Sequence, residues 1–128
     1  MTTSYFVALV THGNLGCEVK TVIEKLVHPL DHIFCYSNSV DSLDVLEEKI
    51  LTKISETKAE HILLITDLMG GSCWLLANRI KKSIPEAKVI GGLNVPLLVS
   101  YLMNHDKLEW NELIDKMVED GKKGMIVR

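Results

Sequence analysis

Residues 7–13 read Val-Ala-Leu-Val-Thr-His-Gly, and this stretch decides the fold because an apolar run stops at a histidine and a glycine. A continuous apolar run is typical of a parallel strand that is covered on both faces. Gly13 permits a sharp turn. Residues 14–27 then carry apolar side chains at helical spacing. His12 is therefore predicted at the carboxyl end of a first strand, where open α/β sheets bind their ligands.

Length and composition indicate one globular domain over residues 1–128. The chain is 47% hydrophobic and 24% charged, which supplies enough apolar side chains for a core. Its net charge of -3 argues against nucleic acid as a partner, because binding to phosphates requires a basic excess. The first residues lack the basic region of a signal peptide, and no apolar run approaches the ~20 residues of a membrane span.

The three cysteines, Cys17, Cys35 and Cys73, are odd in number and widely spaced. They form no Cys-x-x-Cys pair and match no zinc spacing, so we expect neither a disulfide framework nor a metal site. Such cysteine usage fits a reducing cytoplasm. Cys73 follows a predicted helix start, where the pKa of a thiol can fall. It also fits the apolar face of that helix, and burial is the preferred interpretation.

Strand and helix patterns alternate along the chain. Further strands are predicted at residues 32–36, 61–67 and 88–92, and at 124–128, where a short terminal strand needs a partner to be ordered. His28-Pro29 marks the end of the first helix. Asp41 is predicted as the N-cap of a helix that runs to about residue 56, and Ser72 as the N-cap of the next helix. Another helix is predicted from Asn94 to about residue 104, with a proline in its first turn. A last helix is predicted to end with Gly121 at C′.

This alternation predicts an α/β fold, a doubly wound and mainly parallel sheet in the order 2-1-3-4 with helices on both faces. In that order the first and third strands are neighbours at the switch point. His12 follows the first strand and Asp67 follows the third, so the two side chains are expected side by side. A carboxylate bonded to one imidazole nitrogen leaves the other nitrogen as a directed nucleophile.

The turn after the third strand contains Gly70, Gly71 and Ser72. Free amides at a helix N-terminus, together with the Ser72 hydroxyl, predict an anion site. A nucleophilic nitrogen that faces an anion site suits phosphoryl transfer, in which positioning and charge stabilisation provide most of the catalysis. Asp67 would repel a phosphate placed directly on it, so its expected place is behind the ring.

Other interpretations of these residues stay open. A single histidine at a strand end is commonly a packing or surface residue, and most Gly-Gly-Ser turns only start a helix. Their combination at adjacent positions of the sheet favours a site. Arg79 is expected on the surface. The remaining histidines lie at element boundaries without an evident partner, and we expect surface or capping roles for them: His28, His32, His61 and His105.

The sequence resembles the enzyme IIA component of the mannose class (mannose/fructose/sorbose type) of the bacterial phosphoenolpyruvate-dependent sugar phosphotransferase system, the PTS. The resemblance covers nearly the whole chain. It is carried by Val10-Thr11-His12-Gly13, by Asp67-Leu68-Met69-Gly70-Gly71-Ser72, by Gly-Gly-Leu-Asn-Val-Pro-Leu-Leu at 91–98, and by residues 111–114 and 119–124.

The resemblance implies a cytoplasmic phosphocarrier, a transferase and phosphoprotein that needs no metal or cofactor because its donor is already activated. His12 would accept a phosphoryl group from the small carrier protein HPr and pass it to a IIB protein or domain, which serves the membrane components IIC and IID. Asp67 would orient the ring. The phosphoryl oxygens would be bound by Ser72, the amides of Gly70 and Gly71, and Thr11. The family also implies a homodimer, in which residues 124–128 join the partner's sheet.

The sequence departs from the family pattern at three residues after Ser72. Cys73 stands where the family often has proline or threonine, and Leu75 and Leu76 stand where an asparagine is common. These changes flank the anion site, so they bear on its geometry and on partner choice. A regulatory module, of the transcription-regulator or dihydroxyacetone kinase phosphotransfer type, is the second hypothesis. A flavodoxin-like small-molecule binder is disfavoured, because the turn lacks a hydroxyl-rich phosphate loop.

Overall fold

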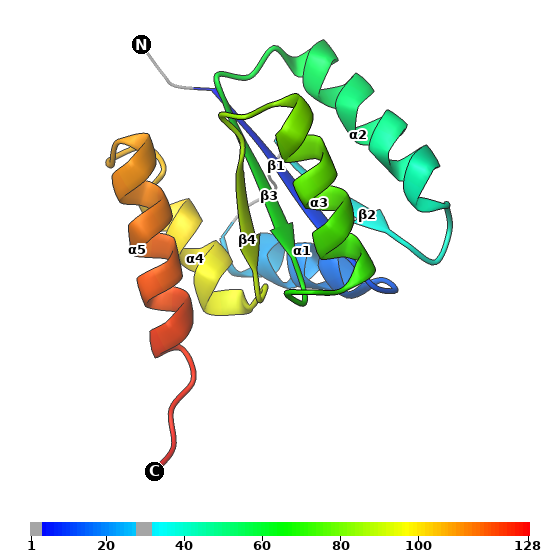
Figure 1. Ribbon diagram of the computed structural model, residues 1–128. Helices are drawn as coiled ribbons and strands as arrows, with labels where there is room; N and C mark the ends of the chain where they lie inside the picture. Colours follow the sequence, from blue (N-terminus) through cyan, green and yellow to red (C-terminus); the bar gives the residue numbers. More distant parts are fainter. Residues whose placement is uncertain (1–3, 28–31) are drawn as a thin grey trace.

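The computed structural model describes residues 4–27 and 32–128, and these residues form one parallel sheet with helices on both faces (Figure 1). All strand pairings are parallel. The strands are β1 (Tyr5–Thr11), β2 (Ile33–Ser37), β3 (His61–Thr66) and β4 (Lys88–Gly91), in the order β2-β1-β3-β4. The predicted α/β class and strand order are confirmed.

Two helices cover one face of the sheet and three cover the other in the described part of the chain. The first layer consists of α2 (Leu43–Thr57) and α3 (Ser72–Ser83), and the second of α1 (Leu15–Leu26), α4 (Val95–Asn104) and α5 (Trp110–Lys123). Arg79 of α3 lies at the surface as expected, and it forms ion pairs with Asp44 at 2.9 Å and Glu47 at 3.0 Å on α2. No helix among residues 4–27 and 32–128 has the length and apolar character needed to span a bilayer.

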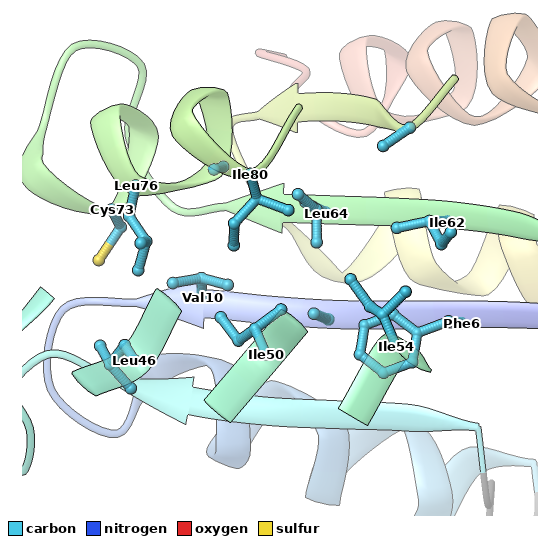
Figure 2. Close-up of a cluster of buried hydrophobic side chains, with 13 residues drawn as sticks. Phe6, Val10, Leu46, Ile50, Ile54, Ile62, Leu64, Cys73, Leu76 and Ile80 are labelled. Carbon is cyan, nitrogen blue, oxygen red and sulfur yellow. The ribbon is translucent and has the colours of Figure 1, made fainter. Parts of the chain in front are cut away.

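The strand β1 shows why the central strands are apolar at nearly every position. Successive side chains of a strand point to opposite faces. Phe6, Ala8 and Val10 pack under α2 and α3, in the cluster shown in Figure 2. Val7 and Leu9 pack under the other three helices. Because both faces are buried, the sequence of β1 is a continuous apolar run.

The N-cap of α2 is Ser42, so the prediction of Asp41 was wrong by one residue. The Ser42 hydroxyl accepts a hydrogen bond from the Val45 N–H at 3.3 Å. The Asp41 carboxylate instead accepts a bond from the Lys49 ammonium at 2.7 Å. Either side chain is a good capping group, and the backbone path decides which one reaches the first turn. The helix predicted from Asn94 to about residue 104 is confirmed as α4, and Asn94 is its N-cap, since its side chain accepts a bond from the Leu97 N–H at 2.9 Å.

Two other helix boundaries also differ from the prediction. The N-cap of α3 is Gly71, and Ser72 is the first helical residue, which frees its hydroxyl from capping. The helix α5 continues past Gly121 to Lys123. Gly121 is buried inside α5, and a Cβ there would lie 3.3 Å from Cδ1 of Leu97. This glycine therefore permits close packing of α5 on α4 instead of ending the helix.

The predicted strand at 124–128 is absent from the described chain, whose last residues extend away from α5 (Figure 1). The side chains of Met125, Ile126 and Val127 are 86%, 72% and 96% exposed. A strand needs a neighbour for its backbone groups. Among the described residues, no strand lies beside this segment, so its apolar side chains remain uncovered.

Cys17 and Cys35 form a disulfide, contrary to the expectation of unpaired cysteines. Cys17 lies in the first turns of α1 and Cys35 lies in the middle of β2. Their separation of 18 residues matches no sequence signature, but the packing of α1 against β2 brings the two Cα atoms to 5.2 Å. The argument for a reducing compartment therefore loses its support from cysteine usage. Cys73 is free and buried, as expected.

Three of the remaining histidines belong to an aromatic cluster, a set of contacts that the predicted surface or capping roles did not include. The capping role is confirmed for His105, which is the C-cap residue of α4. The cluster forms around the amino ends of β1 and β3. The His61 ring stacks on Trp110 with centroids 4.6 Å apart, and the His105 ring stacks on Tyr101 at 4.9 Å. His32 Nε2 lies 2.7 Å from the Tyr101 hydroxyl. His28 and the predicted stop at His28-Pro29 lie outside the described residues.

We expect reduction of the Cys17–Cys35 bond to lower the free energy of unfolding by about 3 kcal/mol, because a bridge over a loop of this size restricts the unfolded chain. Urea unfolding with and without a dithiol reductant measures the difference. The double variant Cys17→Ala/Cys35→Ala keeps Cys73 and should not respond to reductant. Identical unfolding midpoints for the wild type under both conditions would contradict a stabilising bond.

Candidate functional site

His12 follows β1 directly and lies at the edge of the sheet where the parallel strands end. Gly13 comes next with a φ of +56°, a conformation that favours glycine and lets the chain turn into α1. The side chain of His12 is 45% exposed. Its backbone is fixed by the buried strand, whereas its ring is open to solvent on one side.

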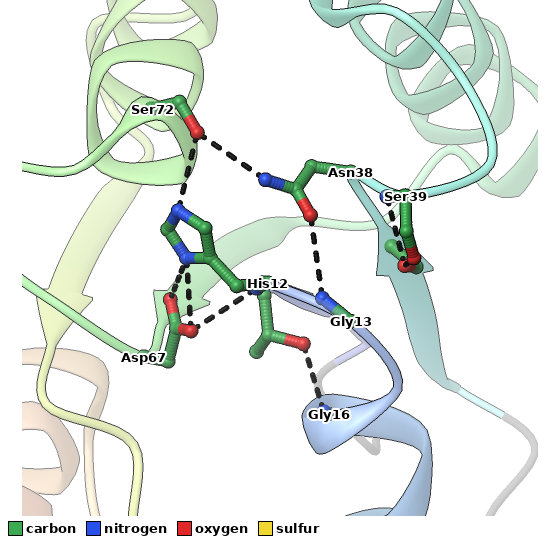
Figure 3. Close-up of polar contacts among 9 residues, drawn as sticks. His12, Gly13, Gly16, Asn38, Ser39, Asp67 and Ser72 are labelled. Atoms are coloured by element: carbon green, nitrogen blue, oxygen red, sulfur yellow. Dashed lines mark hydrogen bonds and ion pairs between the residues drawn. The ribbon is translucent and has the colours of Figure 1, made fainter.

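Asp67 holds the histidine at two points. β1 and β3 are neighbours with Val10 opposite Thr66, so the residues that follow the two strands lie together. The His12 backbone N–H donates to Asp67 Oδ2 at 3.0 Å. His12 Nδ1 lies 3.1 Å from Oδ2 and 3.3 Å from Oδ1 of the same carboxylate (Figure 3). The structure therefore brings together the two residues that the strand order places side by side.

Ser72 lies on the opposite side of the ring from Asp67. Its hydroxyl oxygen is 3.3 Å from His12 Nε2 (Figure 3). Gly71 precedes it, and a Cβ at Gly71 would come within 3.1 Å of His12 Cε1. A larger residue would push the ring by a few tenths of an ångström, so this glycine permits the close approach of the turn to His12. Gly70 is exposed in the same turn.

The contacts of His12 determine which ring nitrogen carries the proton. A carboxylate can only accept hydrogen bonds, so the contact with Asp67 favours a proton on Nδ1. Nε2 is then left with its lone pair, and the Ser72 hydroxyl can donate to it. The first turn of α3 adds backbone N–H groups and the positive end of a helix dipole beside Nε2. This arrangement presents a nucleophilic nitrogen to a region that favours anions.

Thr11 lies beneath the site and its hydroxyl is already engaged. The residue is fully buried, and its Oγ1 accepts a hydrogen bond from the Gly16 N–H at 2.8 Å. That bond satisfies one of the free amides in the first turn of α1. Thr66 occupies a similar place at the end of β3, but its buried hydroxyl has no hydrogen-bond partner among the described residues.

Asn38 is a site residue that the sequence analysis missed. It follows β2, the other neighbour of β1, and its side chain reaches the histidine turn (Figure 3). Asn38 Oδ1 accepts a bond from the Gly13 N–H at 3.3 Å, and Nδ2 donates to Ser72 Oγ at 3.4 Å. Its position could have indicated this role, because Asn38 is a polar residue that directly follows a neighbour of the strand before His12.

A possible metal-ligand set overlaps the site. The donor atoms of His12, Asp67 and Cys73 lie within 4.8 Å of one another. Burial and the nearby Asp67 carboxylate raise the pKa of the Cys73 thiol, so the thiol keeps its proton. A metal would have to displace that proton and break the contact between His12 and Asp67. The donor set is therefore a poor fit to a resident ion.

Comparison with known proteins shows similarity to enzyme IIA components of the PTS. Residues 6–118 match the family model described as PTS system fructose IIA component, EIIA-man. The mannose-specific EIIAB component of the PTS in Escherichia coli K12 is 29% identical over 120 residues, which are 90% of this chain and 36% of that protein. The chain thus spans about a third of the length of that relative. The sorbose-specific EIIA component of Lacticaseibacillus casei is 23% identical over 119 residues, 88% of this chain and 83% of that protein.

Solved structures show the same fold. The phosphotransferase system component EIIA from Streptococcus agalactiae superposes with a TM-score of 0.87 at 19% identity and covers 96% of each chain. The mannose/sorbose-specific IIA subunit from Enterococcus faecalis gives a TM-score of 0.80 at 20% identity, over 100% of this chain and 96% of that one. At these identities the likeness concerns the fold alone.

The two threonines below the site form a matched pair. We expect Thr11→Val to lower the free energy of unfolding by about 1–3 kcal/mol, because the Gly16 N–H loses its partner in a buried place. Thr66→Val makes the same change in the adjacent strand but removes a hydroxyl without a described partner. It should be neutral or stabilise by up to about 1 kcal/mol. Urea unfolding of both variants measures the contrast, and equal losses would contradict it.

Proposed function

Since this chain belongs to the family of PTS fructose IIA components, phosphocarriers of sugar phosphotransferase systems, we propose that it is a relay whose phosphoryl-accepting residue is His12. In this proposal His12 accepts the phosphoryl group from phosphorylated HPr and passes it to a IIB protein or domain, which phosphorylates a sugar that enters through IIC and IID. The observation that supports this most directly is the position of the His12 ring, between the Asp67 carboxylate and the Ser72 hydroxyl.

The first half of the transfer starts from the lone pair of His12 Nε2. Nε2 attacks the phosphorus of the donor's phosphohistidine, and a new N–P bond forms on the side away from Asp67. The N–P bond of the donor breaks, and its electron pair returns to the donor's ring nitrogen. Nδ1 keeps its proton, and the Asp67 carboxylate stabilises the positive charge that develops on the ring of His12. Transfer to IIB is the same displacement with His12 as the leaving group.

The phosphoryl oxygens meet donors on the α3 side of the ring. After attack, the Ser72 hydroxyl can turn from Nε2 to a phosphoryl oxygen, with the amides of Gly70, Gly71 and the first turn of α3 nearby. We assign Thr11 an indirect role, since its hydroxyl supports the first turn of α1. No metal is needed in this scheme, because the donor is an activated phosphoramidate and not a nucleotide.

Exposed apolar side chains around the site favour a protein as donor. Leu15 follows the histidine turn, Leu68 and Met69 lie in the turn after Asp67, and Leu75 lies on α3. Their exposed fractions are 45%, 59%, 72% and 56%. Apolar patches of this kind mark surfaces where proteins dock. Leu75, a departure from the family pattern, is thus placed to affect partner choice.

We also propose that the protein is a homodimer that acts in the cytoplasm, where HPr would receive its phosphoryl group from phosphoenolpyruvate. β4 is an edge strand of the described sheet, and beside it lies a groove of about 320 Å3. The groove is lined in part by Gly91, Leu97, Val118 and Met125. Residues 124–128 of a second copy could pair with this edge and cover their apolar side chains, as the family resemblance implies.

We expect the wild type, incubated with phosphoenolpyruvate, enzyme I and HPr, to acquire one acid-labile phosphoryl group, and His12→Ala to acquire none. Asp67→Ala should be labelled about 10- to 100-fold more slowly, since the His12 ring loses its hydrogen bond to a charged group and the His12 backbone N–H loses its acceptor. Rapid-quench labelling with radioactive phosphoenolpyruvate gives the rates. The variant His61→Gln controls for loss of a histidine far from the site, and labelling of His12→Ala would refute the assignment.

A chase with IIB protein separates the relay from the regulatory alternative. Transfer of the labelled phosphoryl group from His12 to IIB supports the relay. If His12 keeps the label in the presence of IIB, the result supports a regulatory module that reports its phosphorylation state.

For the dimer, we expect the full chain to elute at twice the monomer mass and a chain that ends at Lys123 to be monomeric, because the exchanged segment is missing. Size-exclusion chromatography with light scattering measures both masses. The same number of chains per particle in both proteins, whether one or two, would contradict a dimer that forms by exchange of this segment. Circular dichroism of the shortened chain checks that its helices are intact.

A further inference from the structure

We propose that Asn38 is a positioning residue for the histidine, because its carboxamide directs the Ser72 hydroxyl proton onto His12 Nε2. The inference rests on the proposed function, in which Nε2 is the nucleophile. It concerns a residue outside the turns that carry the family resemblance. The geometry that leads to it is the contact of one amide side chain with both the His12 turn and the start of α3 (Figure 3).

Asn38 reaches the site because β2 lies on the far side of β1 from β3. The last register pair of these strands is Thr11 with Ser37. One residue further, the Asn38 N–H donates to the Thr11 carbonyl oxygen at 3.2 Å, which continues the pairing past the strand. The side chain of Asn38 is half-buried. Its backbone is therefore anchored to the residue that immediately precedes His12.

The partners of the carboxamide fix its orientation. The Gly13 N–H can only donate, so it requires the oxygen of the amide, and this contact is 3.3 Å long. The amide nitrogen then faces Ser72 Oγ at 3.4 Å and can only donate to it. Since the Ser72 oxygen accepts this bond, its own proton remains available for another acceptor.

The Ser72 hydroxyl has His12 Nε2 as an acceptor, since Ser72 Oγ and Nε2 are 3.3 Å apart. The donors therefore run in one direction, from Asn38 to Ser72, from Ser72 to Nε2, and from Nδ1 to Asp67. Asp67 and Asn38 favour the same tautomer from opposite sides of the ring. Without Asn38, the Ser72 hydroxyl could rotate and accept a hydrogen bond from Nε2–H of the other tautomer, which has no lone pair on Nε2.

The bonds to Asn38 are long for hydrogen bonds, so each one is weak. We expect Asn38→Ala to slow phosphorylation of His12 by about fivefold, the effect of one such bond. Asn38→Asp should slow phosphorylation of His12 by more than about fivefold. Its carboxylate can still accept from the Gly13 N–H, but it would also accept a hydrogen bond from the Ser72 hydroxyl and so turn that hydroxyl away from Nε2. Val40→Ala, at a position that is 79% exposed in the same loop, is the matched control and should transfer at the wild-type rate.

A double-mutant cycle with Ser72→Ala tests the route of the effect. If Asn38 acts through Ser72, Asn38→Ala should change the rate by less than about twofold in the Ser72→Ala background. An equal fivefold loss in both backgrounds would overturn the proposal, because it would indicate a structural role of the loop. Thermal unfolding of each variant checks that the fold is retained.

Nitrogen-15 NMR of the His12 ring gives a readout that does not require transfer. The wild type should show protonated Nδ1 and unprotonated Nε2 at neutral pH, and Asn38→Ala should move both shifts toward the average of two tautomers. Unchanged shifts in Asn38→Ala and Asn38→Asp would overturn the inference. If the wild type fails to accept a phosphoryl group, the proposed relay fails, while the NMR result still decides the role of Asn38 in setting the tautomer.

Discussion

The parallel pairing of β1 with β3 is the constraint on which the rest of the structure depends. Val10 lies opposite Thr66, so both strands reach the same edge of the sheet within one residue of each other. Because the side chains of both strands pack against helices on both faces, a slip of register by one residue would move each side chain to the opposite face and disrupt this packing. The core thus determines that His12 and Asp67 meet, although neither residue belongs to the core.

The His12 ring is held in place on its Asp67 side and is otherwise partly open to solvent. The Asp67 side chain is 12% exposed and bonds both the backbone and the ring of His12, whereas the His12 side chain is 45% exposed. Gly71 lets the start of α3 approach the ring. In the proposed relay, the nucleophile has to be accessible because it meets a protein donor and a protein acceptor, and transfer without large motions requires that it be held in place. The two requirements are met by different sides of the same ring.

The turn from His12 into α1 is fixed from several elements at once. Asp67 after β3 and Asn38 after β2 bond its first two amides, and a threonine of β1 bonds a third amide at the start of the helix. A disulfide then joins the same first turns of α1 to β2. If the protein works in the cytoplasm as proposed, cellular thiols act on this one covalent link, whereas the hydrogen bonds remain.

The sequence by itself determined the strands, most of the helices, the sheet order and the pairing of His12 with Asp67, because apolar periodicity and chain order depend on local residues. Only the tertiary structure decided the contacts of Asn38, Cys17 and Cys35, since each depends on a neighbour supplied by another element. The aromatic cluster of His61 and His105, and the packing role of Gly121, were missed for the same reason. Residues 124–128 have a strand-like sequence but remain unpaired, because a strand forms only where backbone partners are available.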